Sequence, residues 1–131
     1  MDNIPKILPE ITFIAEDEKG YELLCNRVQK MPLDAVVLEA TARKKFKEIT
    51  IGLREYRENW YLEEVLNDFM PLMPFWNDGD FIEFFKQYKI RLRMCIVIHQ
   101  FGTYPGMTVD NKVLNLLNKF NGDLDFDIYS M

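Results

Sequence analysis

Three aspartates alternate with apolar residues in the stretch GDLDFDIYS, residues 122–130. Side chains in an extended strand alternate between two faces, so Asp123, Asp125 and Asp127 share one face with Tyr129. Carboxylates that are neighbours on such a face lie about 6.5–7 Å apart. Two of them could bind one hard cation, because Ca²⁺ and Mg²⁺ take carboxylate oxygens as ligands.

An EF-hand calcium loop does not fit this stretch, because the sixth position counted from Asp123 must be Gly and is Ile128. A second strand-like stretch, IRLRMCIVIH (90–99), suggests a structural role for the acidic row. If helices cover the apolar face of both strands, Arg91 and Arg93 lie on the face that carries the aspartates. Opposite charges across strands contribute about 0.2–1 kcal/mol each. We therefore expect a half-solvated structural face, with a two-carboxylate metal site as the alternative.

Nucleophilic catalysis has few candidate residues in this chain. His99 is the only histidine, and Cys95 on the same strand lies about 13 Å from it, too far for a hydrogen bond. A Cys–His pair would therefore need Cys25. Ser130 is the only serine, which makes a Ser-His-Asp triad a poor interpretation.

Cofactor and metal motifs are equally scarce. One histidine and two cysteines cannot complete a tetrahedral zinc site without several carboxylates. The six glycines are scattered and form no phosphate-binding motif. We expect a protein that is not an enzyme and has no catalytic residues, no metal site and no cofactor.

The composition favours a soluble protein with a core. The 131 residues fit a single domain, 1–131, and 48% of them are hydrophobic. A formal charge of −5 disfavours nucleic acid as a partner, and the basic run RKKFK (43–47) is expected to be a solvated hairpin turn. No signal peptide or spanning segment is recognised, and two unpaired cysteines suit a reducing compartment. We expect a cytoplasmic protein with no membrane association.

Hydrophobic periodicity predicts an α+β fold, a mixed and mainly antiparallel sheet with helices packed on one face. The expected strands are 11–16, 34–43, 47–56, 60–65, 90–100 and 122–130, of which the first four form an antiparallel meander. The expected helices are 21–31, 80–89 with Asp80 as N-cap, and 108–122 with Thr108 as N-cap and Gly122 as the left-handed C-terminal residue. Residues 69–79 should form an apolar loop on the core. The helix between the last two strands favours a parallel or next-but-one relation between them.

The C-terminal half resembles a bacterial family known as domain of unknown function 4279. The resemblance lies in NWYLEE (59–64), in an aromatic helix followed by an apolar strand, and in the closing helix with DLDFDIY (123–129). The N-terminal half departs, because Met31-Pro32-Leu33 stands where a Leu-Gly-Ile turn and Pro-Thr would be expected. The resemblance implies a small cytosolic α+β domain and no established activity, although such proteins can look like toxin-immunity proteins.

The function we expect is a non-enzymatic protein-binding module, such as an immunity protein, that uses the polar face of its sheet. Arg and Tyr are enriched at binding hot spots, and complementary charge speeds encounter. The expected partner-binding residues are Arg91, Arg93, His99, Asp125, Asp127 and Tyr129, with Arg54 and Tyr61 as further candidates. The alternatives are a small-ligand or divalent-metal domain that uses the aspartates, and a homodimer with a structural role.

Overall fold

The structure, a computed structural model, describes residues 4–33, 37–58, 61–102 and 105–131. Within them the strands are β1 (Lys6–Ile14), β2 (Val37–Arg43), β3 (Glu48–Leu53), β4 (Arg91–Gln100) and β5 (Asp123–Ser130). The helices are α1 (Glu18–Gln29), α2 (Leu62–Phe69), α3 (Gly79–Gln87) and α4 (Asn111–Lys119), with short 3₁₀ turns η1 (Lys44–Phe46) and η2 (Met70–Leu72). Parts of the predicted strands 34–43 and 60–65 and of the turn 101–106 lie outside the described residues.

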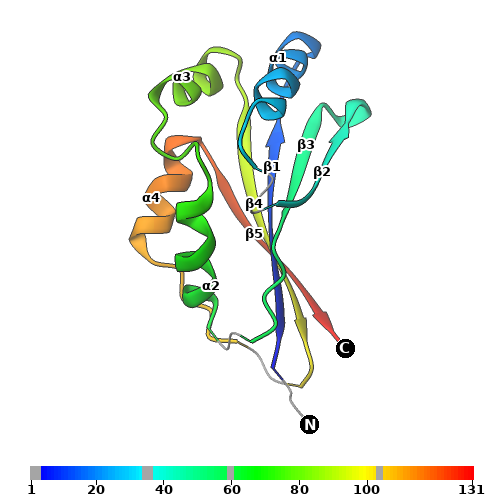
Figure 1. Ribbon diagram of the computed structural model, residues 1–131, viewed down its shortest axis with the longest axis vertical. Coiled ribbons are helices and arrows are strands. Elements are labelled where there is room, and N and C mark those ends of the chain that lie inside the picture. The colour runs from blue at the N-terminus through cyan, green and yellow to red at the C-terminus, as the bar shows by residue number, and fades with distance from the viewer. Residues whose placement is uncertain (1–3, 34–36, 59–60, 103–104) are drawn as a thin grey trace.

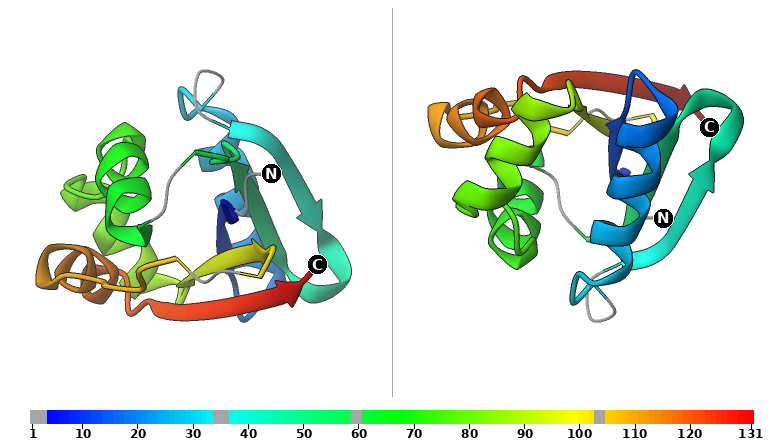
Figure 2. Two further views of the ribbon diagram at one scale, coloured as in Figure 1. Left: turned by 90° about the horizontal axis from the view of Figure 1, so that it is seen from below. Right: turned by 90° about the horizontal axis from the view of Figure 1, so that it is seen from above.

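The five strands form one mixed sheet in the order β2-β3-β1-β4-β5. Neighbouring strands are antiparallel except β4 and β5, which are parallel and connected through α4. The four helices of the described chain lie on one side of this twisted sheet (Figures 1 and 2). The predicted α+β class, the mixed sheet with helices on one face and the parallel relation of the last two strands are confirmed.

The two central strands are buried on one face only. In β1 and β4 every second residue is buried and the residues between them are more exposed. Ile7, Ile11 and Phe13 of β1 lie opposite Ile98, Met94 and Leu92 of β4, and all six side chains are 0% exposed. Because the side-chain period of a strand is two, this register sends the charged residues of these strands to the opposite face, and Gln100 at the end of β4 is the one buried polar side chain of the two strands.

A cluster of aromatic rings joins the sheet to the helices. The Phe13 ring meets those of Phe75, Phe81 and Phe85 at centroid distances of 5.5, 6.0 and 5.6 Å, all close to perpendicular. Edge-to-face pairs of this kind contribute about 0.5–1.5 kcal/mol beyond the area that they bury. Phe120, which directly follows α4, lies 5.0 Å from Phe85 and so extends the cluster to the last helix.

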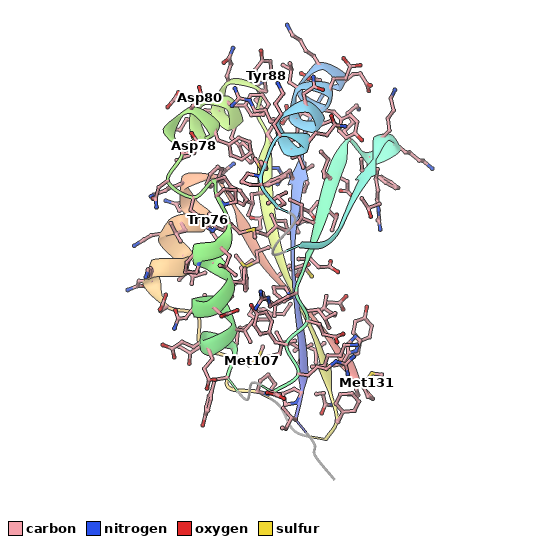
Figure 3. The ribbon with its side chains drawn as sticks, in the orientation of Figure 1. Trp76, Asp78, Asp80, Tyr88, Met107 and Met131 are labelled. Atoms are coloured by element: carbon pink, nitrogen blue, oxygen red, sulfur yellow. The ribbon has the colours of Figure 1, made fainter. Side chains whose placement is uncertain are left out.

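Aspartate is the N-cap residue of three helices. Asp17, Asp78 and Asp110 each accept a hydrogen bond from a backbone N–H in the first turn of α1, α3 and α4. The predicted caps Asp80 and Thr108 are therefore wrong, by two residues in each case. Asp80 lies inside the first turn of α3 (Figure 3), where its carboxylate binds Arg27 of α1 at 2.8 Å.

Two further predictions about the N-terminal half are wrong. The first strands do not form a simple meander, because β3 lies between β1 and β2. The stretch predicted as strand 60–65 enters helix α2, whose Leu62, Val65, Leu66 and Phe69 are buried. These four residues follow the helical spacing i, i+3, i+4 and i+7, whereas a short apolar run also fits a strand. The apolar loop 69–79 is confirmed in its burial, although η2 and the first residue of α3 lie within it.

Strand β1 begins five residues earlier than predicted, despite Pro9 in its interior. Proline cannot donate to a ladder and is confined to edges or bulges of sheets. From the pair Glu10–Gly52 to the pair Ile7–Tyr56, β1 advances by three residues, whereas the segment at the end of β3 advances by four. The pairing is therefore irregular here. Pro9 lies in this irregular stretch, so it can occupy a central strand.

Replacing Phe13 with Ala should lower the free energy of unfolding by about 3–5 kcal/mol, because it opens a cavity against three rings. Urea denaturation followed by circular dichroism measures this change. Phe46→Ala is the matched control, since Phe46 is 59% exposed and its truncation should cost under about 0.5 kcal/mol. Equal effects of the two substitutions would contradict the position assigned to Phe13.

Gly122 lies at a close approach between α4 and β4. The residue in the left-handed conformation is Asn121, with φ 49°, so the conformational role predicted for Gly122 is wrong. A Cβ on Gly122 would lie 2.8 Å from the Leu117 carbonyl oxygen and 3.2 Å from that of Leu92. Glycine is required here because two backbone segments leave no room for a side chain.

Gly122→Ala should therefore destabilise the protein by about 1–3 kcal/mol, since backbone atoms must move to accept the methyl group. Gly79→Ala is the control, because no atom lies within 4 Å of its Cβ position and the residue begins α3. Alanine at that position should be neutral or stabilising by up to about 1 kcal/mol. Thermal unfolding of both variants measures the difference, and a stable Gly122→Ala variant would contradict the close approach.

Candidate functional site

The face of the sheet that points away from the helices carries most of the predicted site. We call this surface the open face. Its residues in the three strands β1, β4 and β5 are Lys6, Leu8, Glu10, Thr12, Ile14, Arg91, Arg93, Cys95, Val97, His99, Asp123, Asp125, Asp127 and Tyr129. The two views of Figure 2 show the helices gathered on the other side of the sheet. The open face is therefore a mixed charged and apolar surface without a helical cover in the described chain.

The six predicted binding residues lie together on this face. In the parallel register, Cys95 lies beside Asp125, Val97 beside Asp127 and His99 beside Tyr129. The aspartates and Tyr129 are exposed, whereas Arg93 and His99 are half-buried. The sequence therefore placed the acidic row and the arginines on one face correctly, while the binding role of these residues stays a prediction.

The two arginines converge on a single aspartate. Nη1 of Arg91 and Nη2 of Arg93 each lie 3.8 Å from Oδ2 of Asp123. In the described part of the chain, no basic side chain forms an ion pair with Asp125 or Asp127. Exposed ion pairs contribute little to stability, about 0–1 kcal/mol, so the arginines compensate only the first carboxylate of the row.

Tyr129 is held in place by two neighbours. Its hydroxyl donates a hydrogen bond of 2.9 Å to Oδ2 of Asp127, and this bond raises the pKa of Tyr129 above its ordinary value. The ring of His99 meets the Tyr129 ring nearly perpendicularly, with centroids 5.4 Å apart. The phenol, the imidazole and the carboxylate thus form one contiguous group at the end of the two strands.

Cys95 is a poor nucleophile in this setting. Burial raises the pKa of its thiol to about 11, and the negative charges of Glu10, Asp125 and Asp127 add to the effect. Only the thiolate is nucleophilic, so little reactive form exists at neutral pH. Cys25 packs against the core on the helical side, opposite to His99, and the two do not form a Cys–His pair.

The two further candidates, Arg54 and Tyr61, do not join the open face. Arg54 lies 3.7 Å from the carboxylate of Asp68 in α2, which also accepts a hydrogen bond from the buried Tyr56. Tyr61 precedes α2, and its ring covers Gly106, where an added Cβ would lie 2.5 Å from the ring. Both residues belong to the helical side.

Sequence reasoning missed the contribution of β1 to the open face. Lys6 lies opposite His99 and binds Glu55 at 2.7 Å, which lowers the pKa of the Glu55 carboxyl. Glu10 lies opposite Cys95, and Thr12 lies opposite Arg93. The alternation of KILPEITFI was the available signal, and Pro9 concealed it because proline argues against a central strand.

Hollows of about 440 and 480 Å³ touch the margins of the open face at Arg91 and at Lys6. In the residues that the structure describes, no group of three or more His, Cys, Asp or Glu side chains could hold a metal ion. A hollow of about 570 Å³ lies on the helical side between α2, η2 and α4, lined by Met70, Met73, Trp76 and Leu116 among others. The indole N–H of Trp76 already donates to the Met70 carbonyl at 2.8 Å, which removes one polar group that a ligand could use. Of the helices in the described chain, none combines the length and apolar character needed to cross a membrane.

The C-terminal part of the chain, which contains β4 and β5, matches a known protein family. A family model described as Domain of unknown function (DUF4279) matches residues 55–131. The match spans more than half of the chain, so the chain belongs to this family and the predicted resemblance is confirmed. It includes β4 and the acidic row of β5, but not β1 or β3. No curated protein and no solved structure matches the chain.

The raised pKa of Cys95 predicts an unusual alkylation profile. In a Cys25→Ala variant, the rate of reaction with iodoacetamide should rise about tenfold per pH unit and continue rising to pH 10, because the thiolate fraction grows up to the pKa of about 11. The Asp125→Asn/Asp127→Asn variant should react faster at each pH, since the pKa of Cys95 falls when two negative charges are removed. The same thiol in urea, where the rate should level off near pH 9, is the control. A native profile that also levels off near pH 9 would contradict the assigned environment.

Proposed function

We propose that this protein is a non-enzymatic binding module that recognises a protein partner through its open face, centred on Arg91, Arg93, His99, Asp125, Asp127 and Tyr129. The observation that carries the proposal is the uncompensated charge of Asp125 and Asp127. These carboxylates are exposed, lie on a face without helical cover and have no ion-pair partner among the described residues.

The charge of this row favours a basic partner surface. Both arginines of β4 approach Asp123, so two carboxylates about 6.5–7 Å apart remain for another molecule. Hydrogen bonds from Lys or Arg to a carboxylate are shorter and stronger than neutral ones. Complementary charge also speeds the encounter between proteins. The formal charge of −5 means that the whole chain attracts a basic partner.

The aromatic part of the open face suits a binding anchor. Tyr129 is 48% exposed, and its hydrogen bond to Asp127 and its contact with His99 restrict its orientation before binding. A preorganised side chain loses less conformational entropy on association. Tyrosine and arginine are enriched among residues that contribute most to binding.

A binding role fits this face better than a catalytic one. The thiol of Cys95 is largely protonated at neutral pH, and His99 contacts Tyr129. We therefore propose that His99 contributes to the interface and not to proton transfer.

The class of partner that we propose is a basic toxin-like protein, for which this chain would act as an immunity protein. An exposed acidic row such as that of Asp125 and Asp127 can neutralise a basic partner by covering it. We further propose that the protein acts in the cytoplasm, since Cys25 and Cys95 are free thiols and a reducing compartment would keep them so.

Affinity capture from the native host, with the protein as bait, tests this role. Asp125→Lys/Asp127→Lys should reduce recovery of a specific partner by about tenfold or more, because hydrogen bonds to charged groups contribute about 1.5–3 kcal/mol each. Glu22→Lys/Glu83→Lys is the matched control, with the same change in formal charge on exposed residues of α1 and α3.

The proposal is supported if the control bait retains the partner that the open-face variant loses. Circular dichroism must show that both variants are folded. Equal recovery with both baits, or no specific partner even when neighbouring genes are co-expressed, would contradict a binding role for the open face.

A further inference from the structure

Strand β5 forms one edge of the sheet, and its outer side pairs with no strand in the described chain. An edge strand presents a row of backbone N–H and C=O groups that can pair with another chain. Figure 1 shows β5 beginning beside α4 and running away from the helices. Met131, which follows the strand, lies far from the helices in Figure 3.

The three aspartates protect this edge by their charge, but the other usual protections against strand pairing do not occur in β5. Natural proteins blunt edges with Pro, Lys, bulges or short strands. The sequence DLDFDIYS contains no Pro, Gly, Lys or Arg, and its register with β4 is regular from Asp123 to Ser130. The opposite edge differs, because the register of β2 shifts between Val37 and Glu39 and the strand leads into the basic turn 43–47.

The helical side of β5 also leaves apolar surface uncovered. Phe126 and Ile128 are 37% and 43% exposed, although their neighbours in β4, Ile96 and Ile98, are fully buried. Leu124 at the beginning of the strand packs against the core beside α4. The apolar row of the sheet therefore extends past the helices and ends at an exposed edge.

A second copy of the chain is a poor occupant of this edge. Two antiparallel β5 strands related by a twofold axis centred on Asp125 would place Asp123, Asp125 and Asp127 of one copy opposite acidic residues of the other. Like charges directly opposite each other across strands are destabilising. The acidic row thus selects against self-pairing and favours a strand with basic residues.

We propose that β5 pairs along its outer edge with an extended segment of a protein partner that alternates basic and apolar residues. The basic side chains would lie beside Asp125 and Asp127 on the open face, and the apolar side chains would cover Phe126 and Ile128. Backbone hydrogen bonds supply affinity in such strand addition, while alternate side chains supply specificity. This inference rests on the proposed binding function and adds the manner in which the partner is held.

Titration of the isotope-labelled protein with a synthetic peptide that alternates lysine and valine tests the proposal. Saturable chemical-shift changes should appear at the β5 amides. Methylation of the peptide nitrogens that would face β5 should weaken binding at least tenfold, because it removes the donors of the shared hydrogen bonds. A peptide with the same composition in two blocks, lysines then valines, should bind weakly, since it cannot place both rows at once.

Charge dependence provides the second part of the test. Asp125→Asn/Asp127→Asn should lower the affinity for the alternating peptide by about tenfold, because two cross-strand ion pairs are lost. Glu22→Gln/Glu83→Gln, with the same loss of charge elsewhere, should leave its affinity unchanged. An alternating glutamate–valine peptide should not bind.

The outcomes separate this proposal from the proposed function. Equal binding of the methylated peptide would show a side-chain contact on the open face, which overturns strand pairing and leaves the binding function standing. No binding of the alternating peptide at millimolar concentration, or sedimentation as a dimer that protects the β5 amides, would overturn strand pairing alone. Equal recovery of the partner with the open-face variant and the control variant in affinity capture would instead overturn the proposed function.

Discussion

The contact of Phe13 with three aromatic rings on one side of the central strand is the interaction on which the rest of the structure depends. Phe75, Phe81 and Phe85 come from the segment between α2 and β4, and their rings meet Phe13 at 5.5–6.0 Å. Because this burial fixes which face of β1 is covered, it also fixes the faces of β3 and β4, which pair with β1 on either side. The position of β5 then follows from its parallel register with β4.

One-sided burial explains the chemistry of the opposite surface. The polar residues of the central strands cannot enter the aromatic core, so they gather on the open face with the acidic row of β5. Charge on this face is only partly compensated, because both arginines approach Asp123 and none approaches Asp125 or Asp127 in the described chain. Burial raises the pKa of Cys95 and the excess negative charge adds to the rise, and we propose that this charge also directs the choice of partner.

The sequence allowed the faces to be predicted, but not the strand order. The alternation of β4 and β5 placed Arg91, Arg93 and the aspartates on one side, since a strand has a fixed period of two. Strand order depends on contacts distant in the sequence, and nothing local showed that β3 lies between β1 and β2. Short signals also misled: Asp80 and Thr108 are both acceptable caps, yet Asp78 and Asp110 are the residues whose carboxylates meet the free N–H groups. The sequence did not show which aspartate the two arginines approach, because that depends on distances between side chains and not on residue spacing along the chain.

Native-state hydrogen exchange of the β5 amides tests the central claim most directly. Successive residues of a parallel edge strand direct their backbone groups alternately to the neighbouring strand and to solvent. We predict that every second amide of β5 is protected by β4 and that the amides between them exchange rapidly, while the amides of β1 that pair with β3 and β4 are uniformly slow. Uniform protection along β5 would contradict the account, because it would mean that the edge is already occupied in the free protein.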